Sequence, residues 1–321
     1  MNDLKRTWNR APAWFTWMIY AAIGVFVLTV VQSLTDTERL TSATTSSAML
    51  RWAVPIMLAG LGGLFSERAG VVNIGLEGML VLGMWFGAWG TINYGPWWGL
   101  VIGILGGGLG ALVHAIATVS FGVDHIISGV AIIIAAPGIT RFLSSEIFAN
   151  YDGGSITQSP GVDGVGKFTF PFLSGGNIGG WTSPDILGWF IDKGWWFVGD
   201  LASVARGLTF NLSQMTVLAY LLVPLSAWVL WRTRFGLRLR IAGENPQAGE
   251  SQGINIIRYK YIGVLLSGAL AGFGGAFISS PELNGIYLEG STLQRGFIGL
   301  AALIIGNWRP TGVMAAALLF G

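Results

Sequence analysis

The chain has 321 residues, of which 52% are hydrophobic and 11% charged, and it contains 49 glycines and no cysteine. Soluble domains have about a quarter charged residues and about 7% glycine, so this composition argues against a disordered chain and against a soluble enzyme. The lack of cysteine excludes disulfides and thiolate catalysis, and a net charge of +2 gives no footprint for nucleic acid. We predict an all-α polytopic membrane protein with about eight to ten transmembrane helices.

Apolar runs long enough to cross about 30 Å of hydrocarbon recur along the chain. The first, Trp14 to Val31, follows a basic stretch that holds Lys5, Arg6 and Arg10. Its apolar core is longer than that of a signal peptide, so we interpret it as an uncleaved first helix. Further spans are expected at residues 48–64, 71–92, 97–118, 126–148, 214–231 and 259–280.

The last two apolar runs are shorter than a full span. The run 293–307 is expected to be a half-helix or partly re-entrant, and the run from Thr311 to Gly321 is expected to be an incomplete helix. The spans divide the chain into an N-terminus with the first helix (1–47), a group of helices (48–148), an external insert (149–213) and a last group of helices (214–321) that includes a cytoplasmic segment (232–258).

The basic residues predict the orientation. If the N-terminus is cytoplasmic and each segment crosses once, the cytoplasmic pieces are 1–13, 65–70, 119–125, 232–260 and 307–310. They hold 11 of the 18 Lys and Arg residues, although the external pieces are longer, so the positive-inside rule is satisfied. The other seven are Arg39, Arg51, Arg141, Lys167, Lys193, Arg206 and Arg295.

The external insert, residues 149–213, is rich in glycine, tryptophan and proline and holds Trp181, Trp189, Trp195 and Trp196. Tryptophan is enriched at both membrane–water interfaces. We favour a place in this interfacial belt over the alternative, a platform for a ligand.

Small residues at four-residue intervals predict close helix packing. Gly268, Gly272 and Ala276 share one helical face, and Gly103, Gly107 and Ala111 repeat the pattern earlier in the chain. Small side chains let helix backbones approach each other within lipid, where no hydrophobic effect drives their association.

Glu77 is the acidic residue that lies well within a predicted span, and Asn73 precedes it by four residues, which would place both on one helical face. A charge in the bilayer costs about 2.5–3.5 kcal/mol on insertion scales, so such a residue usually faces the protein interior. Two interpretations stay open. Asn73 and Glu77 could line a path for solute, or the carboxylate could satisfy backbone groups at a broken, glycine-rich helix start.

No catalytic or metal site is predicted. The run Gly161 to Phe168 nearly matches a phosphate-binding loop, but Phe168 stands where magnesium binding needs Ser or Thr. His114 is isolated on a glycine-rich helix, which favours packing with one hydrogen bond over a proton relay. Any nucleotide that drives this protein is therefore expected to be hydrolysed by another subunit.

The cytoplasmic segment 232–258 carries ordered helix signals. Asn245 or Glu244 can cap a short helix that starts near Pro246, and Gly253 is placed to end it. Arg238 is one of the basic residues that flank this helix. We favour a docking element over a merely solvated loop, because a loop does not need such caps.

Three motifs resemble an ABC importer permease of the ribose, nucleoside and branched-chain amino acid branch. They are Phe65 to Met79 (FSERAGVVNIGLEGM), Gly243-Glu-Asn-Pro through Asn255, and Ser267 to Ala276 (SGALAGFGGA). The form of the first is most similar to the nucleoside, or simple sugar, permeases. The resemblance covers residues 50–321 in the expected order, and the external insert looks longer than is usual.

The resemblance implies a non-catalytic membrane subunit that carries nucleosides or related ribose-containing solutes. It implies a second permease (a related chain or a second copy), two ATP-binding subunits that hold ATP and magnesium, and an extracytoplasmic solute-binding protein. It makes Gly243, Glu244, Asn245 and their neighbours the helix that couples to the ATPase, and it places Asn73 and Glu77 near the translocation path. The rivals are a sugar or amino-acid permease of the same architecture and, from another class, a stand-alone channel or secondary carrier.

Overall fold

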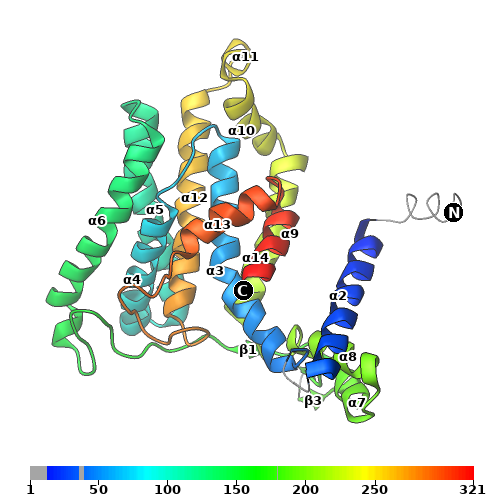
Figure 1. Cartoon of the computed structure of the whole chain (residues 1–321). Coiled ribbons are helices and arrows are strands. Elements are labelled where there is room, and N and C mark those ends of the chain that lie inside the picture. The colour runs from blue at the N-terminus through cyan, green and yellow to red at the C-terminus, as the bar shows by residue number, and fades with distance from the viewer. Residues whose placement is uncertain (1–12, 36–39, 179) are drawn as a thin grey trace, which may run out of the picture. The chain divides into compact units, whose positions relative to one another are not determined.

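The computed structural model describes residues 13–35, 40–178 and 180–321 (Figure 1). The described parts of the chain form two compact units. Unit 1 comprises residues up to 50 together with 167–212, and unit 2 comprises 51–166 together with 213–321. Lys5, Arg6 and Arg10, which are expected to be cytoplasmic, lie outside the described residues.

Unit 2 is mainly helical, and its long helices follow the order of the predicted apolar runs. Its helices are α3 (Ala43–Arg68, of which residues 43–50 belong to unit 1), α4 (Leu76–Tyr94), α5 (Pro96–Ala115), η1 (Ile116–Ser120), α6 (His125–Glu146), η2 (Phe148–Asn150), α9 (Gln214–Arg232), α10 (Arg234–Glu244), α11 (Pro246–Ser251), α12 (Ile256–Ser279), α13 (Arg295–Ile305) and α14 (Pro310–Phe320).

Side-chain caps start several of these helices. The carboxylate of Asp124 accepts hydrogen bonds from two backbone N–H groups at the start of α6, at 2.8 and 3.2 Å. The side chains of Ser213, Thr233 and Asn255 each accept one hydrogen bond from a backbone N–H at the start of α9, α10 and α12, respectively. Each cap satisfies N–H groups that have no partner within the helix, so the chain's polar residues fix where the apolar helices begin.

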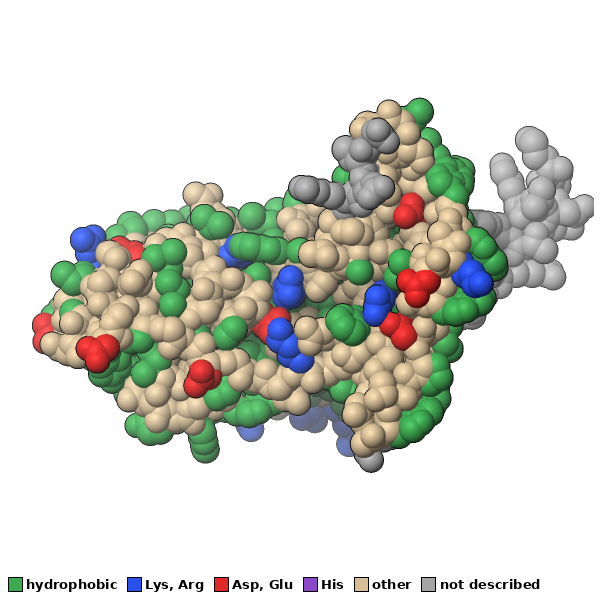
Figure 2. Space-filling model, turned by 90° about the horizontal axis from the view of Figure 1, so that it is seen from below, with side chains coloured by type: hydrophobic (Ala, Val, Ile, Leu, Met, Phe, Trp, Pro, Cys, Tyr) green, Lys and Arg blue, Asp and Glu red, His purple; other side chains and the backbone are tan. Residues whose placement is uncertain are grey.

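Five helical stretches in the described part of the chain are long and apolar enough to cross a membrane: Ala43–Arg68, Pro96–Ser120, His125–Asn150, Gln214–Arg232 and Ile256–Ser279. Shorter apolar helices cover Ala22–Thr35, Arg295–Ile305 and Pro310–Phe320. On the face shown in Figure 2, Lys and Arg side chains are interspersed with Asp and Glu side chains among uncharged ones. The prediction of an all-α polytopic membrane protein is confirmed.

The two predicted glycine stripes pack against each other in an antiparallel arrangement. A Cβ placed on Gly272 would lie 2.4 Å from the carbonyl oxygen of Gly103, and one on Gly268 would lie 2.2 Å from the Cβ of Ala111. Helix α4 joins them, because a Cβ on Gly83 would lie 2.4 Å from the Cα of Gly272. Helices α4, α5 and α12 therefore touch backbone to backbone, as the small-residue spacing predicts.

Helix α13 is the half-helix expected at residues 293–307. Its 11 residues span about 16 Å, which is half of the hydrocarbon layer. It runs along α3, with Gly299 against the backbone of Gly60 and the side chain of Leu303 against Gly63. The preceding segment 280–294 is not helical, but hydrogen bonds to residues 159 and 162 fix it to unit 2. Non-helical backbone at membrane depth is tolerated where protein covers it.

The pieces of unit 2 that the charge pattern assigns to the cytoplasm lie at one end of the unit, which is the upper end in Figure 1. The side chains of Trp308 and Glu67 are hydrogen-bonded, and the hydroxyls of Ser120 and Tyr261 are likewise hydrogen-bonded. The first contact connects the loop 65–70 with the loop 307–310, and the second connects the loop 119–125 with the first turns of α12. We call this the inner end of unit 2.

Unit 1 contains α2 (Ala13–Thr35), the start of α3, two short helices, α7 (Ile186–Asp192) and α8 (Trp196–Gly207), and four two-residue strands. The strands are β1 (Lys167–Phe168), β2 (Asn177–Ile178), β3 (Trp181–Thr182) and β4 (Leu212–Ser213), paired as β1 with β4 and β2 with β3. A Cβ on Gly207 would lie 2.4 Å from the carbonyl oxygen of Ala43, so the end of α8 packs on the first turn of α3. Residues 149–166 of the predicted external insert belong to unit 2 rather than to this unit.

Candidate translocation and coupling site

The coupling segment, residues 232–258, contains the predicted short helix. Helix α11 begins at Pro246, and the side-chain oxygen of Asn245 accepts a hydrogen bond at 3.1 Å from the N–H three residues further on. Gly253 follows the helix with a φ of +72°, a conformation that favours glycine. Of the two candidate caps, Asn245 is therefore the one that the chain uses, and Glu244 is left for another contact.

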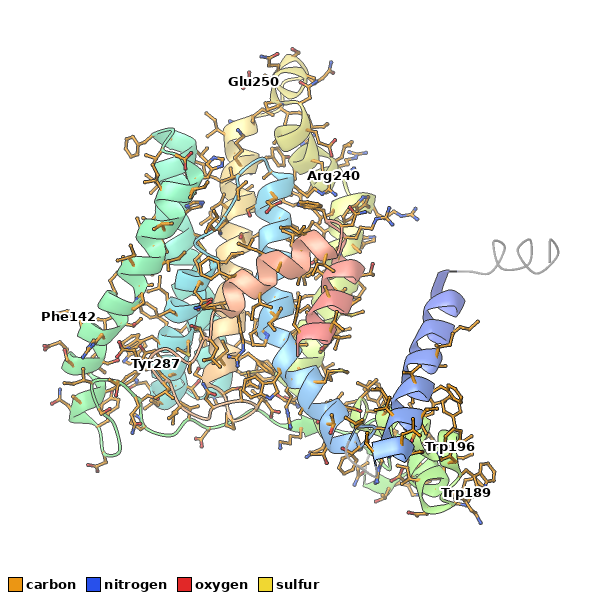
Figure 3. All side chains as sticks on the ribbon, viewed as in Figure 1. Phe142, Trp189, Trp196, Arg240, Glu250 and Tyr287 are labelled. Atoms are coloured by element: carbon orange, nitrogen blue, oxygen red, sulfur yellow. The ribbon has the colours of Figure 1, made fainter. Side chains whose placement is uncertain are left out.

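Helix α11 stands at the tip of the inner end, where Figure 3 labels Glu250. The side chains of Glu244, Asn245 and Gln247 are exposed, so this tip can be reached by another protein. Arg238 lies in α10 and donates to the hydroxyl of Tyr259 on α12 at 3.4 Å, which ties the base of the coupling segment to the membrane helices.

The coupling segment touches the loop between α3 and α4 through two glycines. A Cβ on Gly243 would lie 2.5 Å from the carbonyl oxygen of Arg68 and 2.8 Å from the backbone nitrogen of Gly70. Gly70 itself has a φ of +81°. Because neither position has room for a side chain, the backbone of the coupling segment bears directly on the loop that leads to Asn73.

Arg68 joins three segments at this inner end. Its guanidinium lies 3.6 Å from the carboxylate of Glu244, donates to the carbonyl oxygen of Trp308 at 3.2 Å, and lies 5.6 Å from the ring centroid of Trp231. The adjacent Glu67 accepts from the indole N–H of Trp308. One planar, always charged side chain thus connects the coupling segment with the ends of α9 and α13.

Val72, further along the same loop, forms backbone hydrogen bonds with two histidines. Its carbonyl oxygen can only accept, so Nε2 of His114 is the donor at 3.3 Å, and Nδ1 of the same ring is hydrogen-bonded to the hydroxyl of Ser128 at 2.9 Å. The Val72 N–H donates to His125 Nδ1 at 3.3 Å. A hollow of about 500 Å³ opens beside this loop, lined by residues 72, 74, 118 and 122–126.

Asn73 is fully buried and precedes helix α4 rather than belonging to it. Its side-chain N–H₂ donates to the hydroxyl of Ser267 on α12 at 2.9 Å. Its Oδ1 has no hydrogen-bond partner among the described residues. The expectation of a helix from residue 71 is wrong, because α4 begins at Leu76, and the argument that Asn73 and Glu77 share a face of one helix fails with it.

Glu77 lies in the first turn of α4 with 8% of its surface exposed. Its Oε2 accepts from the backbone N–H of Gly296, in the first turn of α13, at 2.7 Å. A carboxylate is favourable there because the first N–H groups of a helix have no partner within it and carry partial positive charge. The structural interpretation, a carboxylate that satisfies the start of a broken helix, therefore has a specific partner.

Comparison with known proteins identifies the family. Residues 45–321 match the family described as branched-chain amino acid transport system / permease component. The chain belongs to this family. It is a multi-pass protein of the plasma membrane and, like the other members of this family, a non-catalytic permease component.

Named relatives of this permease are ABC transporter permeases. The nucleoside ABC transporter permease protein NupC of Lactococcus lactis is 36% identical over 283 residues, covering 85% of this chain and 78% of the relative. The guanosine ABC transporter permease protein NupQ of Bacillus subtilis is 34% identical over 282 residues, with the same coverage. The putative glucose ABC transporter permease protein TsgC13 of Haloferax volcanii is 31% identical over 276 residues, covering 86% of this chain and 74% of the relative. No solved structure matches the chain.

Sequence reasoning missed three residues of the candidate site. Arg295 was counted among the external cations, but it lies at the start of α13 and is only 4% exposed. Its guanidinium donates to the carbonyl oxygen of Ser291 at 3.0 Å and lies 4.5 Å from the ring centroid of Trp52. Its position directly before a short apolar run was the available signal. Ser267 is the first residue of a quoted motif, and Arg68 was used only to orient the chain.

Metal ligation has no structural basis in residues 13–35, 40–178 and 180–321, where no group of three or more His, Cys, Asp or Glu side chains could hold an ion. The polar groups near Asn73 and Glu77 are amide, hydroxyl, carboxylate and guanidinium groups. Such groups can form hydrogen bonds with a polar solute.

Proposed function

We propose that this permease works as one of two membrane subunits of an ATP-driven importer for nucleosides or related ribose-containing solutes. The identity to NupC and NupQ over most of the chain carries the choice of solute. Two ATP-binding subunits dock on the coupling segment at the inner end, and an extracytoplasmic binding protein delivers the solute. ATP and magnesium bind in those partners and not in this chain.

The contacts at the inner end support a route for coupling. Gly243 bears on the backbone of residues 68–70, and the same loop continues through Val72 to Asn73. A tilt of α11, forced by closure of the ATPases, therefore acts on the loop that begins α4. In this proposal Arg238, Gly243, Glu244, Asn245, Pro246 and Gly253 form the coupling element.

Asn73 and Glu77 are proposed to flank the translocation path. The free acceptor of Asn73 is available to a solute hydroxyl when the helices separate. Glu77 accepts from the backbone N–H of Gly296, and Arg295 donates to the carbonyl oxygen of Ser291. Both groups therefore have partners within the chain, and an uncharged solute such as a nucleoside fits. A simple sugar is uncharged as well, and the identity to the glucose permease TsgC13 makes it the second candidate.

Uptake by vesicles that contain the whole complex tests the proposal. We expect uptake of a radiolabelled nucleoside to require ATP and to be suppressed by other unlabelled nucleosides. Uptake that continues without ATP would reject an ATP-driven importer in favour of a channel or a secondary carrier. Suppression by glucose or leucine, but not by nucleosides, would move the assignment to a sugar or amino-acid permease.

The coupling element has its own test. The change Asn245→Ala removes the cap of α11 and costs about 1 kcal/mol of helix stability, and Glu244→Ala removes the ion pair with Arg68. We expect the double variant to insert normally and to lose most solute-stimulated ATP hydrolysis. Ser251→Ala, at the other end of α11, is the matched control and should keep it. Unchanged stimulation in the double variant would contradict docking at this segment.

A further inference from the structure

The paired helices α7 and α8 of unit 1 expose apolar side chains. Their exposed residues are Ile186, Trp189, Asp192, Trp196, Val198 and Leu201. All but Asp192 are apolar, and more than half of the surface of Trp189 and Trp196 is accessible, 51% and 56% respectively. A surface helix in water shows the opposite pattern, with its polar residues outward. Contiguous exposed apolar surface marks a site that something else covers.

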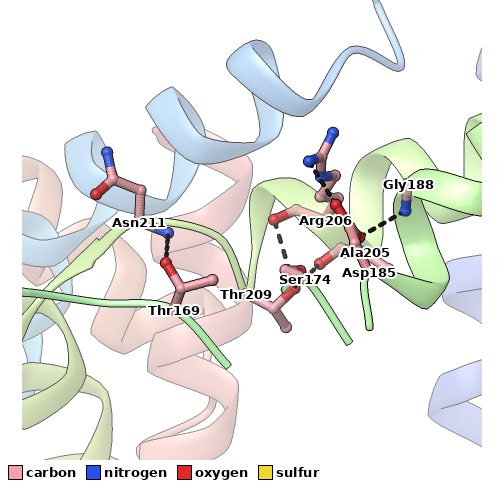
Figure 4. A network of polar contacts seen from close by, with 8 residues as sticks. All are labelled: Thr169, Ser174, Asp185, Gly188, Ala205, Arg206, Thr209 and Asn211. Atoms are coloured by element: carbon pink, nitrogen blue, oxygen red, sulfur yellow. Dashed lines mark hydrogen bonds and ion pairs between the residues drawn. The ribbon is translucent and has the colours of Figure 1, made fainter. Parts of the chain in front are cut away.

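One acidic and one basic residue of this helix pair form contacts within the unit. Asp185 caps α7 by accepting from the N–H of Gly188 at 2.7 Å, and its other carboxylate oxygen lies 2.6 Å from the guanidinium of Arg206 on α8 (Figure 4). Hydroxyls behave similarly, since Ser174 and Thr209 are hydrogen-bonded at 2.6 Å. Asp185 and Arg206 are thus paired within the unit, whereas Asp192, at the C-terminal end of α7, is exposed together with the rings of Trp189 and Trp196.

The first residues of α8 contact α2 both near its C-terminal end and near its middle. The indole N–H of Trp196 donates to the hydroxyl of Ser33 at 2.9 Å, and the ring of Phe26 meets Trp196 and Phe197 edge-on, at centroid distances of 5.9 and 5.6 Å. Phe26 lies about 10 Å below Ser33 along the helix axis. Helix α2 has 23 residues and no charge, which is enough to cross the hydrocarbon layer. If the C-terminal end of α2 is its outer end, the rings of Trp196 and Phe197 therefore lie below that end, beside the membrane-crossing part of α2.

We propose that α7 and α8 form a hairpin immersed in the headgroup and upper acyl layer of the outer leaflet, where lipid covers the face built from Ile186, Trp189, Trp196, Val198 and Leu201. This rests on the proposed orientation, with the N-terminus of α2 in the cytoplasm. Lys193, in the turn between the helices, lies 5.4 Å from the ring centroid of Trp189 and can extend its ammonium group to lipid phosphates. The partner is the bilayer itself.

The absence of native cysteine makes the test direct. Single variants Trp189→Cys and Val198→Cys are labelled with an environment-sensitive fluorophore, and the full chain is reconstituted in phosphatidylcholine–phosphatidylglycerol vesicles. Leu105→Cys, on the exposed face of α5, is the lipid-facing control, and Asp152→Cys, in an exposed loop, is the water-facing control. Quenching by brominated acyl chains and by iodide is measured for each.

At positions 189 and 198 we expect quenching by brominated lipid close to that of the Leu105 control and quenching by iodide several-fold weaker than that of the Asp152 control. Iodide access equal to the Asp152 control would overturn the proposal and make the hairpin a water-exposed element. Protection from both quenchers would overturn it as well, because a protein partner would then cover the face. Since the two labelled positions lie on different helices, one poorly folded variant leaves the other to decide.

Discussion

Helices α4, α5 and α12 of unit 2 touch through their backbones, whereas α8 of unit 1 touches α2 through aromatic rings. In the first region Gly83, Gly103 and Gly272 leave no room for a Cβ. In the second, Phe26 meets two rings edge-on and remains 45% exposed. Contacts between backbones cannot yield when a side chain is added, but contacts between rings can adjust by rotating side chains. The two regions should therefore differ sharply in their tolerance of substitution.

The largest effect is expected from Gly272→Ile. The new Cβ would lie 2.4 Å from the carbonyl oxygen of Gly103 and 3.0 Å from the backbone of Gly107, so two helices must separate. We expect a loss at or above the upper end of the ~1–3 kcal/mol typical of an overpacked core. The thermal midpoint and the monodisperse yield in detergent measure it.

Gly108→Ile is the matched control for this change. Gly108 lies in α5, next to the stripe, and has nothing within 4 Å of its Cβ position. Its variant should keep the yield and the midpoint of the unsubstituted chain. Equal loss in both variants would mean that a large side chain anywhere on α5 or α12, and not the backbone contact, sets the cost.

An intermediate effect is expected from Glu77→Ala, where a side chain meets a backbone group. The change removes a charge-assisted hydrogen bond to Gly296, worth about 1.5–3 kcal/mol. Glu77→Gln keeps an acceptor oxygen and should recover part of the lost thermal stability. If Gln is as destabilising as Ala, charge rather than hydrogen bonding holds the start of α13.

The smallest effect is expected from Trp196→Phe in unit 1. The new ring keeps an edge contact with Phe26 but loses the hydrogen bond to Ser33, worth about 0.5–1.5 kcal/mol. The thermal midpoint should fall by no more than a few degrees. A fall in the thermal midpoint as large as that of Gly272→Ile would show that ring contacts tolerate substitution no better than backbone contacts, and it would contradict the comparison.

Much of the fold could be predicted because the membrane imposes local rules. Apolar runs located the helices α3, α5, α6, α9 and α12, and the spacing of Gly268 and Gly272 identified the stripe that meets α5. The start of α4 was missed. Residues 71–75 are apolar enough for a span, but contacts with α6 and α12 hold them out of a helix, among them the close approach of Gly75 to Gly129.

The candidate site was only partly predictable. Asn245 and Pro246 carry their cap signals locally, so the start of α11 was correct. The partner of Glu77 lies 219 positions away in the chain, and nothing near Glu77 indicates Gly296. Arg295 was counted only as one of the seven basic residues outside the cytoplasmic pieces. Helix α13 is a half-helix, so its first residue lies within the protein.

The contact between Trp308 and Arg68 has a mechanical consequence. Trp308 follows the C-terminal end of α13, and the N-terminal end of that helix is fastened to Glu77. Eleven hydrogen-bonded residues form a stiff rod of about 16 Å. A displacement of Arg68 would therefore be felt at Glu77, about 16 Å away at the other end of this rod, without any long helix having to bend.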